Sequence, residues 1–162
     1  MDTVALLEEI DRVFPLVAKP SGDLIMFHQS GCYECEGVRN DLEQYSEPSL
    51  PDNAIRYLHN DMTCLSADGW RWVLPSYLKR CVTQDLYDPV ETEFLIYNLS
   101  PNEKYEAETK QRLSKLSQEQ LACLVHFIEW CENHPHWSEY CAAEIPKAIE
   151  FLHSLKRDSN AI

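Results

Sequence analysis

The sequence has few glycines and lacks the short motifs that mark many catalytic sites. It contains four glycines in 162 residues, which leaves little room for a glycine-rich loop that cradles phosphate. It also contains no G-x-S-x-G and no H-E-x-x-H. The serine hydrolases, zinc proteases and nucleotide-binding enzymes that carry these motifs are therefore not indicated.

Long hydrophobic runs are also missing. No run of 18 apolar residues occurs, and the first residues, MDTVALLEEIDRVFP, are acidic and amphipathic rather than basic and then apolar. We therefore expect no membrane span and no signal peptide, and we expect a cytoplasmic protein. The seven cysteines are an odd number in a chain long enough for an ordinary core, which favours free thiols.

Positive charge is scarce. The chain has 14 Lys and Arg against 27 Asp and Glu, a formal net charge of −13, and the acidic excess is present in both halves. Such a field repels the phosphates of nucleic acids and of anionic membranes. We therefore expect neither nucleic acid nor a membrane as a partner, and an acidic domain of this kind suits a basic protein partner.

The length and the hydrophobic pattern predict a single compact domain, residues 1–162, that is mainly α with two or three short strands (α+β). Apolar residues at helical spacing predict helices at 2–13, 32–45, 66–81, 117–133 and 138–156. Short apolar runs predict strands at 23–27 and 94–97, with 54–58 as a third.

The sharpest local pattern is Cys32-Tyr-Glu-Cys35, at a predicted strand-to-helix junction. A thioredoxin-like thiol oxidoreductase places its attacking cysteine there, so Cys32 would attack and Cys35 would resolve the mixed disulfide. The acidic neighbours Glu34 and Glu36 would raise a thiol pKa rather than lower it, and Pro75 lies in a helical context, not before a strand. Unreactive structural thiols are the favoured interpretation, and redox catalysis is an alternative.

Metal binding is the second alternative for the same cysteines. His28, His59 or Cys64 could complete a tetrahedral site with Cys32 and Cys35 if the fold brings them together. A second C-x-x-C or an H-x-x-x-H would strengthen this hypothesis, and neither is present. We therefore predict that the protein needs no metal or other cofactor.

Three motifs also carry a resemblance. They are Cys32-Tyr-Glu-Cys35, Leu65-Ser-Ala-Asp-Gly69 leading into Leu74-Pro-Ser-Tyr-Leu78, and Leu116-Ser-Gln-Glu-Gln120. In this order they resemble a family of small bacterial proteins of unknown function, over about residues 20–155. The resemblance implies that the segment around Pro75 is helical, which weakens the thioredoxin interpretation. It implies no reaction.

The favoured function is therefore non-catalytic: binding, and thereby neutralising or regulating, a basic partner protein such as a toxin or effector, as immunity proteins and antitoxins do. Two acidic stretches and two aromatic anchors would form the docking face. These residues are Glu34, Glu36, Glu43, Glu47, Asp85, Asp88, Glu91, Glu93, Tyr87 and Trp137.

Overall fold

Three helices begin at side chains that the sequence marks as caps. Asp2 caps α1 (Thr3–Val13), Ser66 caps α4 (Ala67–Thr83) and Ser117 caps α7 (Gln118–Asn133), and each side-chain oxygen accepts the backbone N–H three residues further on. At Ser117 the return bond from Gln120 completes a capping box. The predicted starts of these three helices are confirmed.

The computed structural model describes residues 1–158, with side chains through residue 156. The other helices in this part are α2 (Tyr33–Leu42), α3 (Asp52–Leu58), α5 (Val90–Leu99), α6 (Glu106–Leu113), α8 (Pro135–Tyr140) and α9 (Glu144–Asp158). Three short 3₁₀ turns lie between them: η1 (Gly22–Ile25), η2 (Met62–Cys64) and η3 (Glu103–Tyr105). None of these described helices is long and apolar enough to cross a membrane.

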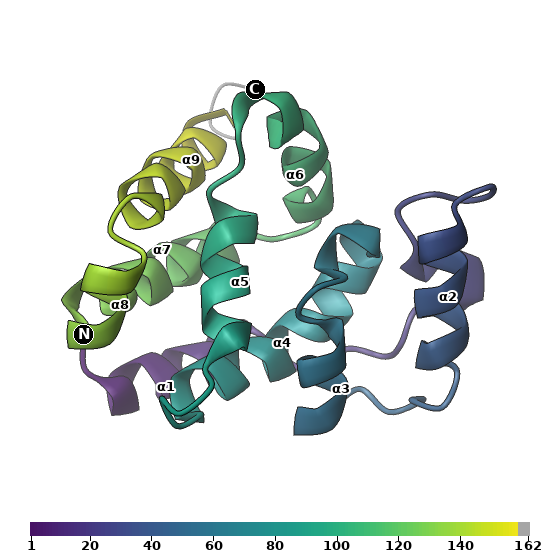
Figure 1. Ribbon diagram of the computed structural model, residues 1–162, viewed down its shortest axis with the longest axis horizontal. Coiled ribbons are helices and arrows are strands. Elements are labelled where there is room, and N and C mark those ends of the chain that lie inside the picture. The colour runs from purple at the N-terminus through teal and green to yellow at the C-terminus, as the bar shows by residue number, and fades with distance from the viewer. Residues whose placement is uncertain (159–162) are drawn as a thin grey trace.

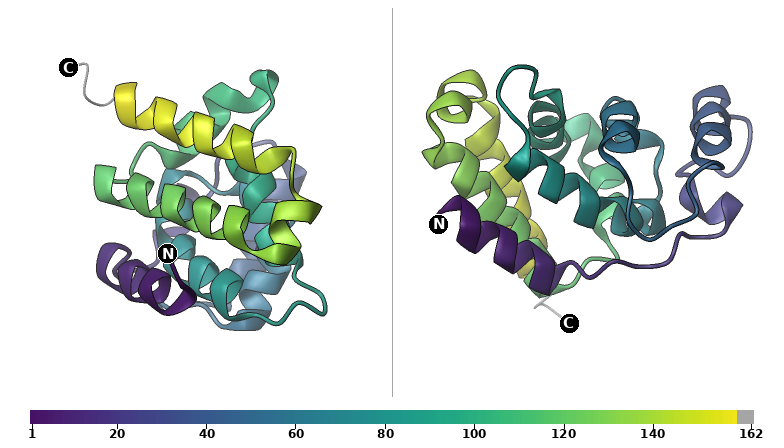
Figure 2. Two further views of the ribbon diagram at one scale, coloured as in Figure 1. Left: turned by 90° about the vertical axis from the view of Figure 1, so that its left-hand side faces the viewer. Right: turned by 90° about the horizontal axis from the view of Figure 1, so that it is seen from below.

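The helices pack around α4 and α7 (Figure 1). On one side α9 packs on α7 and α7 packs on α1, so that the three lie one above another (Figure 2). The long helix α4 contacts α1, α3, α5 and α6, and it buries Trp70, Trp72 and Tyr77 completely. At the far end α2 is held beside η2. The central helix α4 thus connects the α1, α7 and α9 layer to the region around α2.

The predicted strands are wrong, because residues 1–158 contain no β-strand and the domain is all-α in this part. Residues 54–58 belong to α3 and residues 94–97 belong to α5. In α5 the buried positions Glu91, Leu95 and Leu99 are four residues apart, as a helix requires. Because Glu91, the first of these buried positions, is charged, the apolar residues of the sequence alone do not show the helical spacing.

Residues 23–27 form a turn and one bridge instead of a strand. Met26 and Leu65 make an isolated antiparallel bridge. The Phe27 N–H donates to the Cys64 carbonyl and the Ser66 N–H donates to the Ile25 carbonyl, each at 2.8 Å. This bridge fixes the segment that precedes α2 against η2.

Three prolines fall inside helices, of which Pro135 is the first residue of α8. Pro75 lies within α4, as the resemblance implied, and the helix continues past it. The predicted helix 138–156 is two helices, α8 and α9, and Pro146 lies in the first turn of α9, where its missing N–H costs no helical hydrogen bond.

Candidate functional site

The His28–Cys35 segment is shaped by the end of the bridge and the start of α2. Gly31 has a φ of 74°, a left-handed conformation that favours glycine, directly before Cys32. Cys32 is the N-cap residue of α2, and Cys35 follows one turn later. Residues three apart lie on the same face of a helix, so both thiols face the same side.

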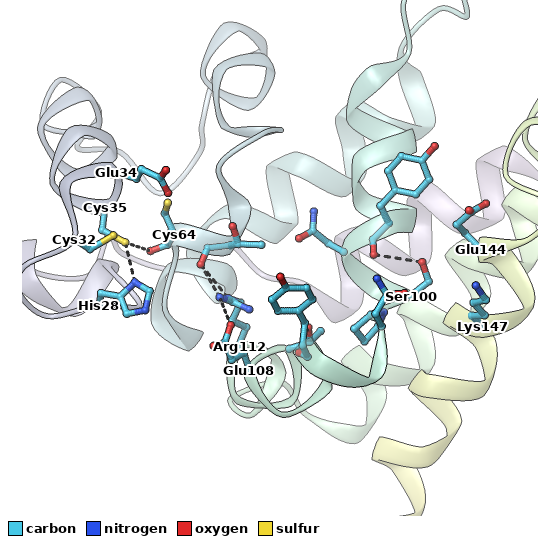
Figure 3. Close-up of a pocket in the computed structure, with 17 residues that line it drawn as sticks. His28, Cys32, Glu34, Cys35, Cys64, Ser100, Glu108, Arg112, Glu144 and Lys147 are labelled. Carbon is cyan, nitrogen blue, oxygen red and sulfur yellow. Dashed lines mark hydrogen bonds and ion pairs between the residues drawn. The ribbon is translucent and has the colours of Figure 1, made fainter.

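The loop brings a histidine to these thiols (Figure 3). The Cys35 Sγ atom lies 3.5 Å from His28 Nδ1. The candidate ligand atoms of His28, Cys32 and Cys35 all lie within 4.8 Å of one another. His28 is exposed, Cys32 is half-buried and Cys35 is buried. The cluster therefore extends from the protein surface to the edge of the core.

Cys64, the fourth residue that the sequence suggested, is not part of this cluster. Its backbone carbonyl accepts a weak hydrogen bond from the Cys35 thiol, at 3.8 Å, while its own sulfur points away from His28 (Figure 3). Burial and then the neighbouring Cys35 thiol raise the pKa of Cys64 to about 12. Burial and then the Cys32 thiol also raise the pKa of Cys35, against lowering hydrogen bonds from the His28 backbone and the Cys64 side chain.

A cavity of about 580 Å³ begins at the thiols and extends to α9 (Figure 3). The start of α2, η2, the segment from α5 to η3, α6 and α9 form its walls. Its charged lining residues are Glu34, Glu108, Arg112, Glu144 and Lys147. The cluster therefore faces a space of the size that takes small molecules.

Arg112 is the most constrained of the charged residues in the wall. Its side chain is only 5% exposed, its Nε and Nη2 atoms donate to the Thr63 carbonyl at 3.1 and 2.8 Å, and its guanidinium lies 4.1 Å from the ring centre of Phe27. The nearest carboxylate, Glu108, is 3.5 Å from Nη2 and half exposed. Burial lowers the pKa of Arg112, although an arginine stays charged in proteins.

Sequence reasoning missed Arg112. The only signal was its place next to Leu113, on the buried face of α6. An arginine at such a position has to find partners elsewhere in the fold, but the sequence does not say which ones.

The predicted docking residues do not form one surface. Glu34, Glu36, Glu43 and Glu47 are exposed on α2 and on the loop after it, at one end of the molecule. The exposed residues Asp85, Tyr87 and Asp88 lie in the loop between α4 and α5, where Asp88 pairs with Arg56 of α3.

Three of the predicted docking residues are withdrawn from solvent to different degrees. Glu91 is 0% exposed, and it pairs with Arg56 at 3.3 Å and Arg80 at 3.5 Å, so it is a structural charge and not a docking group. Trp137 is 1% exposed and belongs to the core, so it is not an exposed anchor. Glu93 is half-buried and accepts a hydrogen bond from the Tyr97 hydroxyl.

Comparison with known proteins gives one match. The model of a family of unknown function, DUF6714, matches residues 4–149. No curated protein and no solved structure matches the chain. The resemblance to an uncharacterised family is thus confirmed, and any activity has to be argued from the site itself.

Proposed function

Because the chain belongs to a family of unknown function, DUF6714, we propose its function from the geometry of this site. The protein binds a thiophilic divalent metal ion of the zinc class through His28, Cys32 and Cys35. The fourth coordination position faces the cavity and takes an external ligand. The function is thus metal-dependent binding of a small molecule.

The distance between Cys35 Sγ and His28 Nδ1 carries this proposal. In a tetrahedral site with Zn–S of about 2.3 Å and Zn–N of about 2.0–2.1 Å, a sulfur and a nitrogen ligand lie about 3.6 Å apart. The two atoms here are 3.5 Å apart. The separation of these two atoms therefore matches that of two ligands in a tetrahedral zinc site.

The chemistry of the three groups also favours such an ion. Thiolate and imidazole are the ligands that zinc prefers, and two thiolates neutralise the charge of a divalent ion. Cys32 and Cys35 lie at the N-terminus of α2, where the backbone N–H groups stabilise negative charge. The raised pKa of Cys35 means that metal binding has to displace a proton.

The number of protein ligands favours a metal site with an open coordination position over a purely structural one. Structural zinc sites are usually closed by four protein ligands, whereas catalytic sites keep three and leave one position for water or substrate. The cluster has three, and Cys64 does not complete it. Because Cys32 and Cys35 line the cavity, the remaining position opens into it.

The test is a Co²⁺ titration followed by competition with Zn²⁺. We expect one ion per chain, with the near-ultraviolet band of thiolate coordination and the visible bands of tetrahedral Co²⁺. His28→Ala and Cys35→Ser should each weaken binding at least tenfold. The matched controls His153→Ala, at an exposed position on α9, and Cys123→Ser, at a buried thiol on α7, should leave binding unchanged. If His28→Ala binds the metal ion as tightly as the unmodified protein does, the proposed site is refuted.

A second candidate function, recognition of a basic partner protein, is supported by one surface loop. Tyr87 is 96% exposed and Leu86 is 47% exposed, and they lie between Asp85 and Asp88. An exposed aromatic residue beside carboxylates suits an anchor that inserts next to basic side chains.

This second candidate is tested with a partner isolated from cells and then measured as a purified pair. The association rate should fall steeply with salt, because the attraction is electrostatic. Tyr87→Ala should speed dissociation at least tenfold, and Tyr140→Ala, an exposed tyrosine on α8, should not. A partner bound equally well by both variants at all salt concentrations would exclude this loop as the anchor.

A further inference from the structure

Arg112 is held against the two segments that adjoin the metal cluster. Its guanidinium stacks on Phe27, the neighbour of His28, and it donates twice to the carbonyl of Thr63, the neighbour of Cys64. These contacts fix the orientation of the guanidinium before any ligand arrives, which lowers the entropic cost of binding one. Arg112 is thus a rigid group beside the cluster and not a mobile surface charge.

The hydrogen bonds of Arg112 are incomplete. Its Nε and Nη2 atoms are used, but Nη1 donates to none of the residues that the structure describes. Its nearest carboxylate, Glu108, is only at the limit of ion-pair distance. A buried guanidinium usually gains two parallel hydrogen bonds from one carboxylate, so this position lacks its best partner.

We propose that the cavity binds a small molecule through a carboxylate that bridges Arg112 and the metal ion at His28, Cys32 and Cys35. The inference rests on the proposed metal site. One carboxylate oxygen fills the open coordination position, and the other accepts a hydrogen bond from Arg112.

A divalent ion with two thiolates and a neutral imidazole carries no net charge, so the metal centre itself does not repel a carboxylate. The cationic lining residues Arg112 and Lys147 attract one, against Glu34, Glu108 and Glu144 in the same wall. The cavity of about 580 Å³ has room for the rest of a metabolite-sized ligand, toward Glu144 and Lys147 (Figure 3).

Two readouts on the unmodified protein test the bridge. The Nε–H of Arg112, which is held by the Thr63 carbonyl, is followed by heteronuclear NMR in the zinc-loaded protein, and the visible spectrum is followed in the Co²⁺ protein. The probes are succinate, L-alanine and inorganic phosphate. Succinate or L-alanine should shift the Arg112 resonance saturably and change the Co²⁺ bands. Tighter binding of succinate indicates a dicarboxylate ligand, and tighter binding of L-alanine indicates an amino acid.

A pair of variants measures how much Arg112 contributes to the affinity for the carboxylate. Arg112→Lys should weaken binding of the better carboxylate about ten- to a hundredfold, the range of one charge-assisted hydrogen bond. Arg71→Lys, at an exposed position on α4, should have no effect. If Arg112→Lys does not fold, the NMR and Co²⁺ readouts on the unmodified protein still decide.

The failures of the two proposals are distinguishable. Metal binding that depends on His28, with no response of Arg112 or of the Co²⁺ bands to carboxylates, would overturn the bridge and leave the metal site standing. Phosphate binding as tightly as the carboxylates would overturn the carboxylate assignment. Failure to bind metal at all would overturn the proposed function, and a carboxylate response of Arg112 without metal would also overturn the bridge.

Discussion

At the scale of single residues, exposure separates one cysteine from the other six. Cys32 is half-buried, and Cys35, Cys64, Cys81, Cys123, Cys131 and Cys141 are buried. Burial raises the pKa of the Cys123 thiol to about 12 and of the Cys141 thiol to about 11. A protonated and inaccessible thiol reacts slowly, so reactivity should be confined to one position.

We therefore predict one fast thiol among seven when the native protein reacts with a disulfide reagent at neutral pH. Cys32→Ser should remove the fast phase, and Zn²⁺ should slow it because the metal occupies the same sulfur. Cys123→Ser is the matched control and should leave the fast phase intact. Two or more fast thiols in the folded protein would contradict the burial pattern.

The same scale shows why part of the site could be predicted. His28, Cys32 and Cys35 lie within eight residues, so the chain itself keeps them close, and the sequence could name them as candidates. Arg112 reaches them only through the packing of α6 against the Phe27 and Thr63 segments. No local pattern carries that information, because contacts between distant segments depend on the whole fold.

At the scale of elements, a buried charge joins three helices. Glu91 on α5 is completely buried between Arg56 of α3 and Arg80 of α4. Both arginines also pair with surface carboxylates, Asp88 and Asp52. The α3, α4 and α5 interface therefore depends on one carboxylate that has no access to water.

Glu91→Gln should lower the free energy of unfolding by about 1.5–3 kcal/mol, because a neutral amide of the same shape leaves the two arginines without their shared counter-ion. Urea denaturation measures it. Glu132→Gln, at an exposed position on α7, is the control and should change stability by less than about 0.5 kcal/mol. Equal effects of the two substitutions would mean that the buried carboxylate contributes nothing specific.

Two helical glycines offer a second comparison between elements. A Cβ atom at Gly69 of α4 would lie 2.6 Å from the Ile25 carbonyl oxygen, whereas one at Gly37 of α2 would meet nothing within 4 Å. Gly69→Ala should destabilise the protein by about 1–3 kcal/mol, because α4 has to move away from η1. Gly37→Ala should stabilise it by about 0.5–1 kcal/mol, because alanine is the better helix former.

The midpoints of urea unfolding curves give both values. The opposite signs are the decisive outcome, since helix propensity alone predicts that both alanines stabilise. A stabilising Gly69→Ala would show that η1 does not pack on α4 as described.

The sequence predicts the helices with explicit caps most directly, although it also predicts α2, whose N-cap residue Cys32 makes no side-chain cap bond. Asp2, Ser66 and Ser117 each mark a helix start by a local hydrogen bond that the sequence pattern reveals. The sequence favours strands at 54–58 and 94–97 because α3 is only two turns long and α5 buries Glu91. Short apolar runs do not distinguish a strand from a buried helix segment, and only tertiary packing decides.

At the scale of the whole molecule, the largest buried side chains lie on helices other than α2. Trp70, Trp72, Trp137, Tyr77 and Phe127 are on α4, α7 and α8, while His28 and Cys32 lie on the loop before α2. Of the three proposed ligands only Cys35 belongs to the buried core, so most of the apolar burial that stabilises the helices does not depend on a metal ion.

This arrangement predicts how the protein responds to metal removal. A chelator should leave the helical circular dichroism signal nearly unchanged, because the core stays packed. It should lower the thermal midpoint, because an ion bound only to the folded state stabilises it by about 2.7 kcal/mol at a hundredfold excess of free ion over the dissociation constant. In His28→Ala the midpoint should no longer respond to Zn²⁺, while in His153→Ala it should respond as in the unmodified protein. A chelated protein that loses its helical signal would instead have a metal site that is essential for folding, as in a zinc finger.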